Sequence, residues 1–127
     1  MNGFIPLVDL KTNYLSIKPE IDSAIKRVID NSSFILGNEV KRFEENFASF
    51  LNIKYCAGVS SGTSAIELAL KACGIGIGDE VITTPHTWVS TAEAISNVNA
   101  VPIFVDIDKN SYNIDPNLIE EKISKKT

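Results

Sequence analysis

Residues 78–106 read GDEVITTPHTWVSTAEAISNVNAVPIFVD, and this stretch decides the fold. A strand is predicted over 80–84, which follows a Gly-Asp turn and ends before Pro85. Residues 87–97 have the spacing of an amphipathic helix, and a second, largely apolar strand is predicted over 101–106. Strands that alternate with helices in this way are typical of a parallel sheet covered by crossover helices. The stretch therefore predicts a strand–helix–strand unit of an α/β fold.

The same alternation continues on both sides of this unit. Upstream, the pattern predicts a short strand over 55–59 and a helix over 63–73 that Gly74 ends. Downstream, Asp115 caps a last helix over 116–124. We therefore expect three parallel strand–helix units in residues 53–127.

Two amphipathic helices precede the strand–helix units and form a separate helical segment over residues 1–52. The first is predicted over 17–29, with Pro19 in its first turn. The second follows a break that ends at Gly37, and Asn38 is its predicted N-cap.

Composition favours a soluble cytoplasmic protein. The 127 residues carry a formal net charge of -4, and no basic stretch is longer than Lys125-Lys126. Binding to nucleic acid or to an anionic membrane therefore has no electrostatic basis. The sequence shows no signal-peptide pattern and no apolar run of about 20 residues. Cys56 and Cys73 lie in apolar runs without metal-ligand spacing, which predicts buried, reduced thiols.

Functional sites in parallel α/β folds lie at the carboxyl ends of the strands. Three loops fall there, at 60–64, 84–88 and 106–110. The first reads SSGTS and has two interpretations. Its hydroxyls can cap the following helix, or its backbone N–H groups can bind a phosphate at the helix N-terminus. It is neither a P-loop, because it lacks the lysine and the spacing, nor a dinucleotide fingerprint, because it has one glycine.

The other two loops carry fewer signals. Trp88 is either a core or lid aromatic or a flat platform for an aromatic ligand, and the pattern alone favours the first. His86 has no partner at a readable spacing, so we interpret it as a loop residue. Asp106 and Asp108 could bind a polar ligand, but turn chemistry favours a solvated turn.

Five motifs, in this order, resemble the N-terminal part of the DegT/DnrJ/EryC1/StrS family of PLP-dependent sugar aminotransferases. They read FIPLVDLK, FILGNEVKRFEENFASFL, GVSSGTSAIELAL, GIGIGDEVITTPHTWVSTAEAI and PIFVDIDKNSYNIDPNLIEEKI. The resemblance covers nearly the whole chain. It implies an incomplete large domain of the fold-type I transferases over 1–127, with strand order 3-2-4-5-6-7-1. The strands at 80–84 and 101–106 are then neighbours, whereas the strand at 55–59 lacks both of its partners.

The resemblance also implies a cofactor site. It places the phosphate of pyridoxal 5'-phosphate (PLP) on Gly62, Thr63 and Ser64, and the pyridine ring against Trp88. The implied reaction transfers an amino group from an amino acid, commonly glutamate, to a nucleotide-linked keto sugar. A homodimer is expected for the full-length protein, with no nucleic-acid or membrane partner.

The family's Schiff-base lysine lies beyond the end of this chain, so no catalytic residue is assigned and we expect the 127 residues alone to be inactive. A dehydratase of the same family is an alternative, because relatives carry histidine in place of that lysine. A non-catalytic binding or assembly module is a third interpretation.

Overall fold

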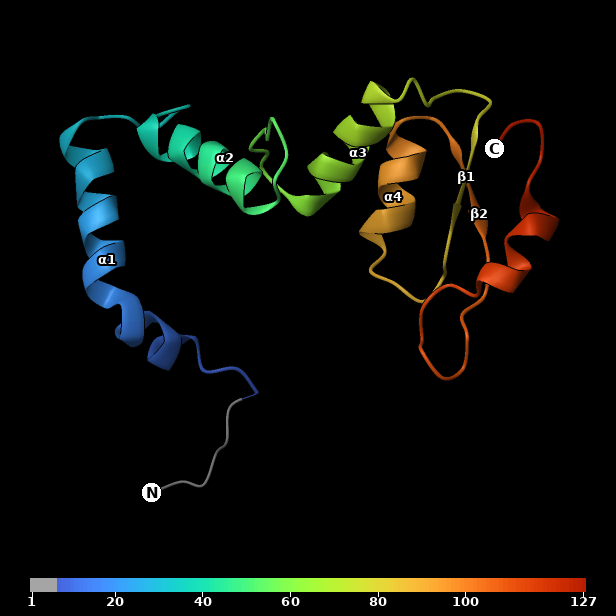
Figure 1. The fold of residues 1–127 in the computed structure, drawn as a ribbon, viewed down its shortest axis with the longest axis horizontal. Helices are drawn as coiled ribbons and strands as arrows, with labels where there is room; N and C mark the ends of the chain where they lie inside the picture. The colour runs from blue at the N-terminus through green and yellow to red at the C-terminus, as the bar shows by residue number, and fades with distance from the viewer. Residues whose placement is uncertain (1–6) are drawn as a thin grey trace. The chain divides into compact units, whose positions relative to one another are not determined.

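The computed structural model describes residues 7–127, so the beginning of the FIPLVDLK motif lies outside the described residues. The chain forms two compact units, Met1–Gly58 and Val59–Thr127 (Figure 1). The first unit holds helix α1, Leu10–Asp30, and helix α2, Asn38–Phe50. The second contains helices and a small sheet.

Both predicted helices of the first unit are present, but α1 begins well before residue 17. Asp9 caps it: the Asp9 carboxylate accepts the backbone N–H of Thr12 at 2.9 Å and the Thr12 hydroxyl at 2.7 Å. The prediction of Pro19 in the first turn is therefore wrong, since Pro19 lies inside the helix. The apolar stripe marked only part of the helix, whereas the cap decides where it starts.

The second helix begins at its predicted cap, one position earlier than expected. Asn38 is the first helical residue, and Gly37 occupies the N-cap position. A Cβ on Gly37 would stand 2.6 Å from the backbone oxygen of Ser33, so a side chain does not fit there. Close approach of the preceding loop, rather than a capping side chain, determines this helix start.

The second unit contains helix α3, Gly62–Ala72, strand β1, Glu80–Thr83, helix α4, Ser90–Asn97, and strand β2, Val101–Phe104. The strands pair in parallel, from Glu80 opposite Val101 to Thr83 opposite Phe104. This pairing confirms the strand–helix–strand prediction and the expected neighbour relation of the two strands.

The core of this unit lies between the helices and the sheet. Ile95, Val98 and Ala100 are buried together, and Leu70 and Val81 pack against them. The α4 side chains Ala94 and Ile95 are 0% and 2% exposed. The side of α4 that carries these residues thus faces the strands, and α3 packs alongside α4.

The predicted strand at 55–59 does not form. In the described residues the sheet has two strands, and the segment at 55–59 is not one of them. Gly58 instead donates its backbone N–H to the carboxylate of Glu44 on α2, at 2.7 Å. A strand needs a partner ladder for its backbone groups, and here a side chain supplies one acceptor in its place.

The prediction of one continuous helix over 116–124 is also wrong. The Asp115 carboxylate accepts the backbone N–H of Asn117 at 2.9 Å, as a cap should, but only two short 3₁₀ helices follow. They are η1, Pro116–Leu118, and η2, Glu120–Lys122. Helix segments this short gain little without an apolar face to bury, and the side chains here stay largely exposed.

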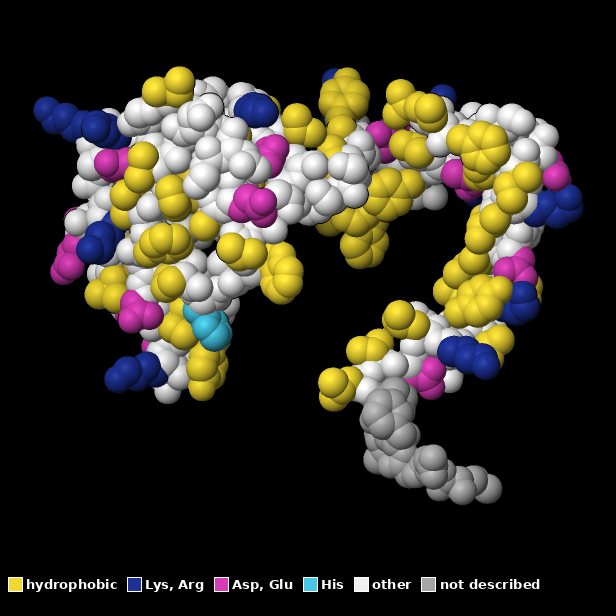
Figure 2. All heavy atoms as spheres, turned by 180° about the vertical axis from the view of Figure 1, so that it is seen from behind, with side chains coloured by type: hydrophobic (Ala, Val, Ile, Leu, Met, Phe, Trp, Pro, Cys, Tyr) yellow, Lys and Arg dark blue, Asp and Glu magenta, His cyan; other side chains and the backbone are white. Residues whose placement is uncertain are grey.

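Large apolar side chains remain exposed in both units (Figure 2). On α2 they include Phe43, Phe47 and Phe50. The rings of Phe43 and Phe47 are stacked, and that of Phe50 is tilted against Phe47. The prediction of two buried thiols is wrong, because Cys73 is exposed and Cys56 half-buried; both are unbridged. Among residues 7–127 none of the helices is long and apolar enough to span a bilayer.

Candidate functional site

The loop at 60–64 joins directly to the first turn of α3. Ser61 is the N-cap, with an extended backbone at φ -161° and ψ 165°. Its hydroxyl oxygen accepts the backbone N–H of Ser64 at 3.1 Å. The capping interpretation of this loop is thus present in the structure.

Three serine hydroxyls gather at the same point. The Ser64 hydroxyl oxygen lies 3.1 Å from the hydroxyl oxygens of both Ser60 and Ser61. Hydroxyl groups donate as well as accept, so this cluster can reorient toward an anion without losing its internal bonds. The loop therefore presents a polar, uncharged surface at the positive end of the helix.

The first two helical N–H groups stay available. Among the described residues no acceptor is present for the backbone N–H of Gly62 or of Thr63, because the Ser61 hydroxyl takes only that of Ser64. A Cβ built on Gly62 would meet nothing within 4 Å. Free N–H groups, hydroxyls and open space beside a glycine are the donor set that a phosphate group requires, so these residues fit the phosphate of PLP.

Trp88 lies between β1 and α4. Its side chain is 77% exposed, so it is not a core residue of this chain. Its carbonyl oxygen accepts the backbone N–H of Thr91 at 3.0 Å, which ties it to the first turn of α4. The indole is thus free to contact a ligand on the side of the sheet where β1 ends.

The two loops belong to the same end of a helix pair. Helices α3 and α4 lie side by side and run in the same sense (Figure 1). The Asn97 side-chain amide near the end of α4 donates to the carboxylate of Glu67 in the middle of α3. Because this bond ties the end of α4 to α3 and the helices run in the same sense, their first turns lie at the same end of the pair. Gly62 begins α3 there, and Trp88 lies just before α4.

The third loop folds as a turn. The Asp108 carboxylate accepts the backbone N–H groups of Ser111 at 2.8 Å and Asn110 at 3.1 Å. The Ser111 N–H bond, followed by that from Asn110, lowers the pKa of Asp108 from its ordinary value. Asp106 accepts the N–H of Ile107 at 2.8 Å. Both carboxylates thus serve the turn, as turn chemistry predicted.

The structure places His86 beside Tyr112, which sequence reasoning missed. The ring centroids are 6.0 Å apart and the ring planes are inclined at 38°. The two residues belong to the loops after β1 and after β2. Because adjacent parallel strands end side by side, residues of these two loops become neighbours, and this was the available signal.

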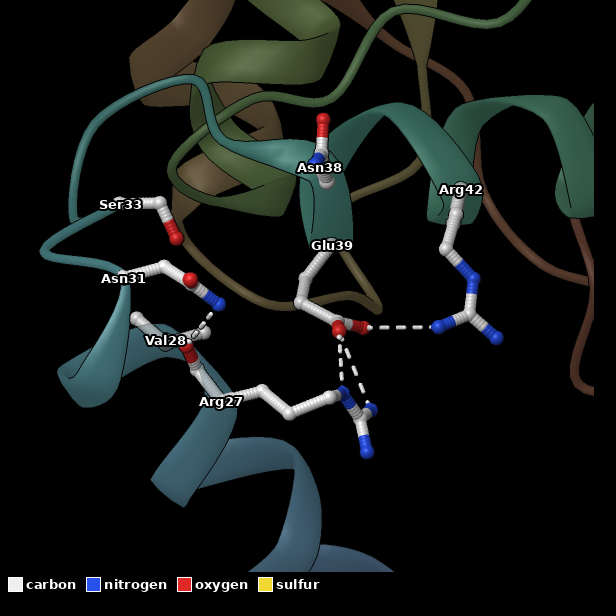
Figure 3. A pocket seen from close by; sticks show the side chains of 7 residues that line it. All are labelled: Arg27, Val28, Asn31, Ser33, Asn38, Glu39 and Arg42. Carbon is white, nitrogen blue, oxygen red and sulfur yellow. Dashed lines mark hydrogen bonds and ion pairs between the residues drawn. The ribbon is translucent and has the colours of Figure 1, made fainter.

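The first unit has a pocket of about 480 Å³ between the end of α1 and the start of α2 (Figure 3). Glu39 occupies it and pairs with two cations. Arg27 donates from Nε and Nη2 to one Glu39 oxygen, both at 3.1 Å, and Arg42 lies 3.6 Å from the other. Ion pairs this exposed contribute little stability. The pocket is a corner between two helices of the first unit. The Arg42–Glu39 spacing along one helix was readable from the sequence, whereas the Arg27–Glu39 pair was not.

The sequence also matches a known protein family. The DegT/DnrJ/EryC1/StrS aminotransferase family matches residues 15–127. The chain belongs to this family. The sequence-based resemblance is thereby confirmed, and so is the N-terminal part of a fold-type I transferase as its fold.

Two curated relatives resemble nearly the whole chain. The UDP-2-acetamido-2-deoxy-3-oxo-D-glucuronate aminotransferase of Pseudomonas aeruginosa is 43% identical over 97% of this chain and 34% of its own length. The dTDP-3-amino-3,6-dideoxy-alpha-D-galactopyranose transaminase of Aneurinibacillus thermoaerophilus is 45% identical over the same shares. The chain thus spans about a third of the length of these relatives.

Solved structures agree in fold and cofactor. The S. venezuelae protein DesV, in complex with a ketimine intermediate, is 39% identical with a TM-score of 0.93 over 97% of this chain and 33% of its own. The E. coli GDP-4-keto-6-deoxy-D-mannose-3-dehydratase, with bound hydrated PLP, is 33% identical with a TM-score of 0.75 over 83% of this chain and 28% of its own. The expectation of a PLP-dependent family is confirmed.

Proposed function

We propose that residues 60–64 hold the phosphate of PLP in an aminotransferase that acts on a nucleotide-linked keto sugar, with Trp88 against the pyridine ring. The observation that carries the proposal is the pair of available N–H groups on Gly62 and Thr63 at the N-terminus of α3. The relatives named above, which act on nucleotide-linked sugars, support the substrate class.

Each residue has a defined task in this proposal. The Gly62 and Thr63 N–H groups bind phosphate oxygens, and the helix dipole favours their negative charge. The Ser64 hydroxyl donates to the phosphate while the Ser61 hydroxyl keeps the Ser64 N–H satisfied. Trp88 orients the ring by stacking. When bound, PLP supplies the electron sink for amino transfer.

Two substitutions of Gly62 test the phosphate contact. Proline is well tolerated at the first position of a helix, and the extended backbone of Ser61 suits a following proline. Gly62→Pro therefore deletes one N–H and leaves α3 intact, whereas Gly62→Ala keeps the N–H. A hydrogen bond to a charged group is worth about 1.5–3 kcal/mol, so Gly62→Pro should weaken PLP binding roughly 10- to 150-fold relative to Gly62→Ala.

Pyridoxal, which lacks the phosphate, is the matched ligand. Both compounds react with exposed lysine amines, but pyridoxal also closes to an internal hemiacetal. The two Gly62 variants are therefore compared with each compound separately, and a difference between the variants that is confined to PLP reports the phosphate contact. Binding is followed by quenching of the fluorescence of Trp88, the chain's one tryptophan. Equal retention of PLP and pyridoxal, or equal affinity of the two Gly62 variants for PLP, would contradict the proposal.

We also propose that the 127-residue polypeptide alone transfers no amino group. The resemblance places the lysine that binds the cofactor covalently outside these residues, and covalent catalysis needs a positioned amine. Product formation from glutamate and a keto-sugar nucleotide is measured against a buffer blank. Amino transfer above the blank would overturn this proposal. The full-length protein is proposed to be a homodimer.

A sugar dehydratase is the second candidate, because a dehydratase is among the similar solved structures. The two functions share the phosphate site and differ in the residue at the lysine position. Reading the coding sequence beyond codon 127 for lysine or histidine distinguishes them. A reading frame that ends there would favour a non-catalytic binding or assembly module.

A further inference from the structure

The contact between His86 and Tyr112 joins two loops at the end of the sheet where Trp88 lies. We propose that Tyr112 is a positioning residue for Trp88, acting through His86. The ring of Tyr112, 6.0 Å from the imidazole between centroids, holds the loop at 84–88 in the conformation that sets the indole. The inference deepens the proposed function, because it concerns the residue that stacks on the cofactor ring.

Tyr112 belongs to a loop that several backbone hydrogen bonds hold in place. Ile107 and Ile114 form an antiparallel bridge, and Asp108 donates its N–H to the Asn113 oxygen at 2.9 Å. The Tyr112 N–H returns to the Asp108 oxygen at 2.9 Å, in addition to the bonds of the Asp108 carboxylate. Tyr112 itself has φ 57°, a left-handed conformation that a bulky residue adopts only where its surroundings hold it.

The Trp88 loop, by contrast, is weakly held on its N-terminal side. The His86 N–H lies 3.3 Å from the Thr84 hydroxyl oxygen, and the Thr87 and Thr91 hydroxyl oxygens are 3.4 Å apart. Both distances are at the long limit of hydrogen bonding. Within residues 7–127, the aromatic contact that reaches this loop from another element is the one from Tyr112. Loss of the Tyr112 ring therefore frees the segment that leads to Trp88.

The chain supplies its own probe, because Trp88 is the one tryptophan in the sequence. Fluorescence anisotropy and acrylamide quenching of Trp88 are measured on the whole chain without cofactor, with excitation where tyrosine does not absorb. Tyr112→Asn removes the ring and tolerates the left-handed backbone, whereas Tyr112→Phe keeps the ring. We expect lower anisotropy for Tyr112→Asn, an altered quenching constant, and wild-type values for Tyr112→Phe.

The partner residue provides the second arm. His86→Ala breaks the same contact from the other side, and His86→Phe keeps an aromatic ring there. The double variant Tyr112→Asn/His86→Ala should change Trp88 no further than either single variant, because both remove one contact. Circular dichroism checks that each variant retains its helices. If Tyr112→Asn does not fold, the comparison of His86→Ala with His86→Phe tests the inference instead. Wild-type anisotropy and quenching in the ring-deleted variants would overturn the inference.

Cofactor binding separates this inference from the proposed function. If Trp88 stacks on PLP, Tyr112→Asn should weaken PLP binding roughly 2- to 10-fold, the factor that one aromatic pair represents. A change in Trp88 without cofactor, combined with no binding of PLP by the wild-type chain, leaves the positioning role intact and removes the cofactor role. If PLP binding depends on Gly62 but the anisotropy and quenching of Trp88 do not change in Tyr112→Asn, the cofactor role stands and the positioning role is overturned.

Discussion

The backbone N–H of Ser64 donates to the hydroxyl oxygen of Ser61 at 3.1 Å. Ser61 therefore caps α3 by satisfying the third N–H of the helix and leaves the first two, those of Gly62 and Thr63, to another acceptor. Capping and anion binding are thus divided between neighbouring groups of one turn rather than competing for the same ones.

Replacement of Ser61 tests the cap. Ser61→Ala removes the acceptor for the Ser64 N–H and should lower the free energy of unfolding by about 1 kcal/mol. Ser61→Gly, which relaxes the cap without the same loss, should cost only a few tenths of a kcal/mol. Urea denaturation followed by circular dichroism measures both. A wild-type free energy of unfolding in Ser61→Ala would show that the hydroxyl does not act as a cap.

Ser61→Asp separates the cap from the phosphate site. A carboxylate caps a helix as well as a hydroxyl does and is favoured by the dipole, so the free energy of unfolding should be retained or raised. The same charge repels a phosphate bound to the neighbouring N–H groups, so PLP binding should fall at least about tenfold. Unchanged PLP affinity in a stably folded Ser61→Asp would place the cofactor elsewhere.

Replacements of Trp88 distinguish stacking from packing. Trp88→Ala should weaken PLP retention more than Trp88→Phe does, because phenylalanine keeps a stacking face worth about 0.5–1.5 kcal/mol. Since the side chain is 77% exposed, neither change should alter the unfolding midpoint appreciably. Retention is measured by cofactor absorbance after gel filtration in a full-length relative. Equal loss in both variants would indicate a packing role.

The buried face of α4 should dominate the stability of the second unit. Ile95 is 2% exposed and packs among Val98 and Ala100, so Ile95→Ala should cost about 2–5 kcal/mol and Ile95→Val about 0.5–1.5 kcal/mol. Leu68→Ala is the control, because this side chain is 53% exposed and should change little. Denaturant melts compare the three. A small effect of Ile95→Ala would mean that the core is loosely packed.

The turn at 108–111 should respond to acid. The pKa of Asp108 lies below its ordinary value of 3.8 because its ionised carboxylate accepts the Ser111 and Asn110 N–H groups. A depressed pKa stabilises the fold above the ordinary value, and this contribution is lost as the pH falls through the lowered one. The amide resonances of both residues should therefore hold steady from pH 7 to about 5 and shift only in stronger acid. Asp108→Asn should abolish that titration, and a shift near neutral pH would contradict the assignment.

The sequence predicted the strand–helix–strand unit well because each part is specified locally. The apolar runs at 80–84 and 101–106 have turn residues on both sides, and the Ile95 face of α4 repeats at helical spacing. The loop at 60–64 was also readable, since a cap and an anion site need the same residue types. Which N–H groups of this loop are capped and which stay available could be read only from the structure.

Most of the errors share a physical origin, because they concern contacts that are not local. The segment at 55–59 has strand composition but no neighbouring strand, and residues 116–124 have helix signals but no face to bury. The start of α1 was missed because the Asp9 cap precedes the apolar stripe. The pairing of Tyr112 with His86 joins loops far apart in the sequence, and the one signal for it was that adjacent parallel strands end side by side.

The hydrogen bond from Gly58 to Glu44 has a consequence for the order of folding events. One carboxylate occupies a backbone donor of a segment with strand composition, and the bond must break before that donor can enter a ladder. Because a single side-chain hydrogen bond has a net value of only about 1–3 kcal/mol, its release is fast compared with sheet assembly. The Gly58 donor therefore becomes available to a neighbouring strand only after the Glu44 carboxylate has released it.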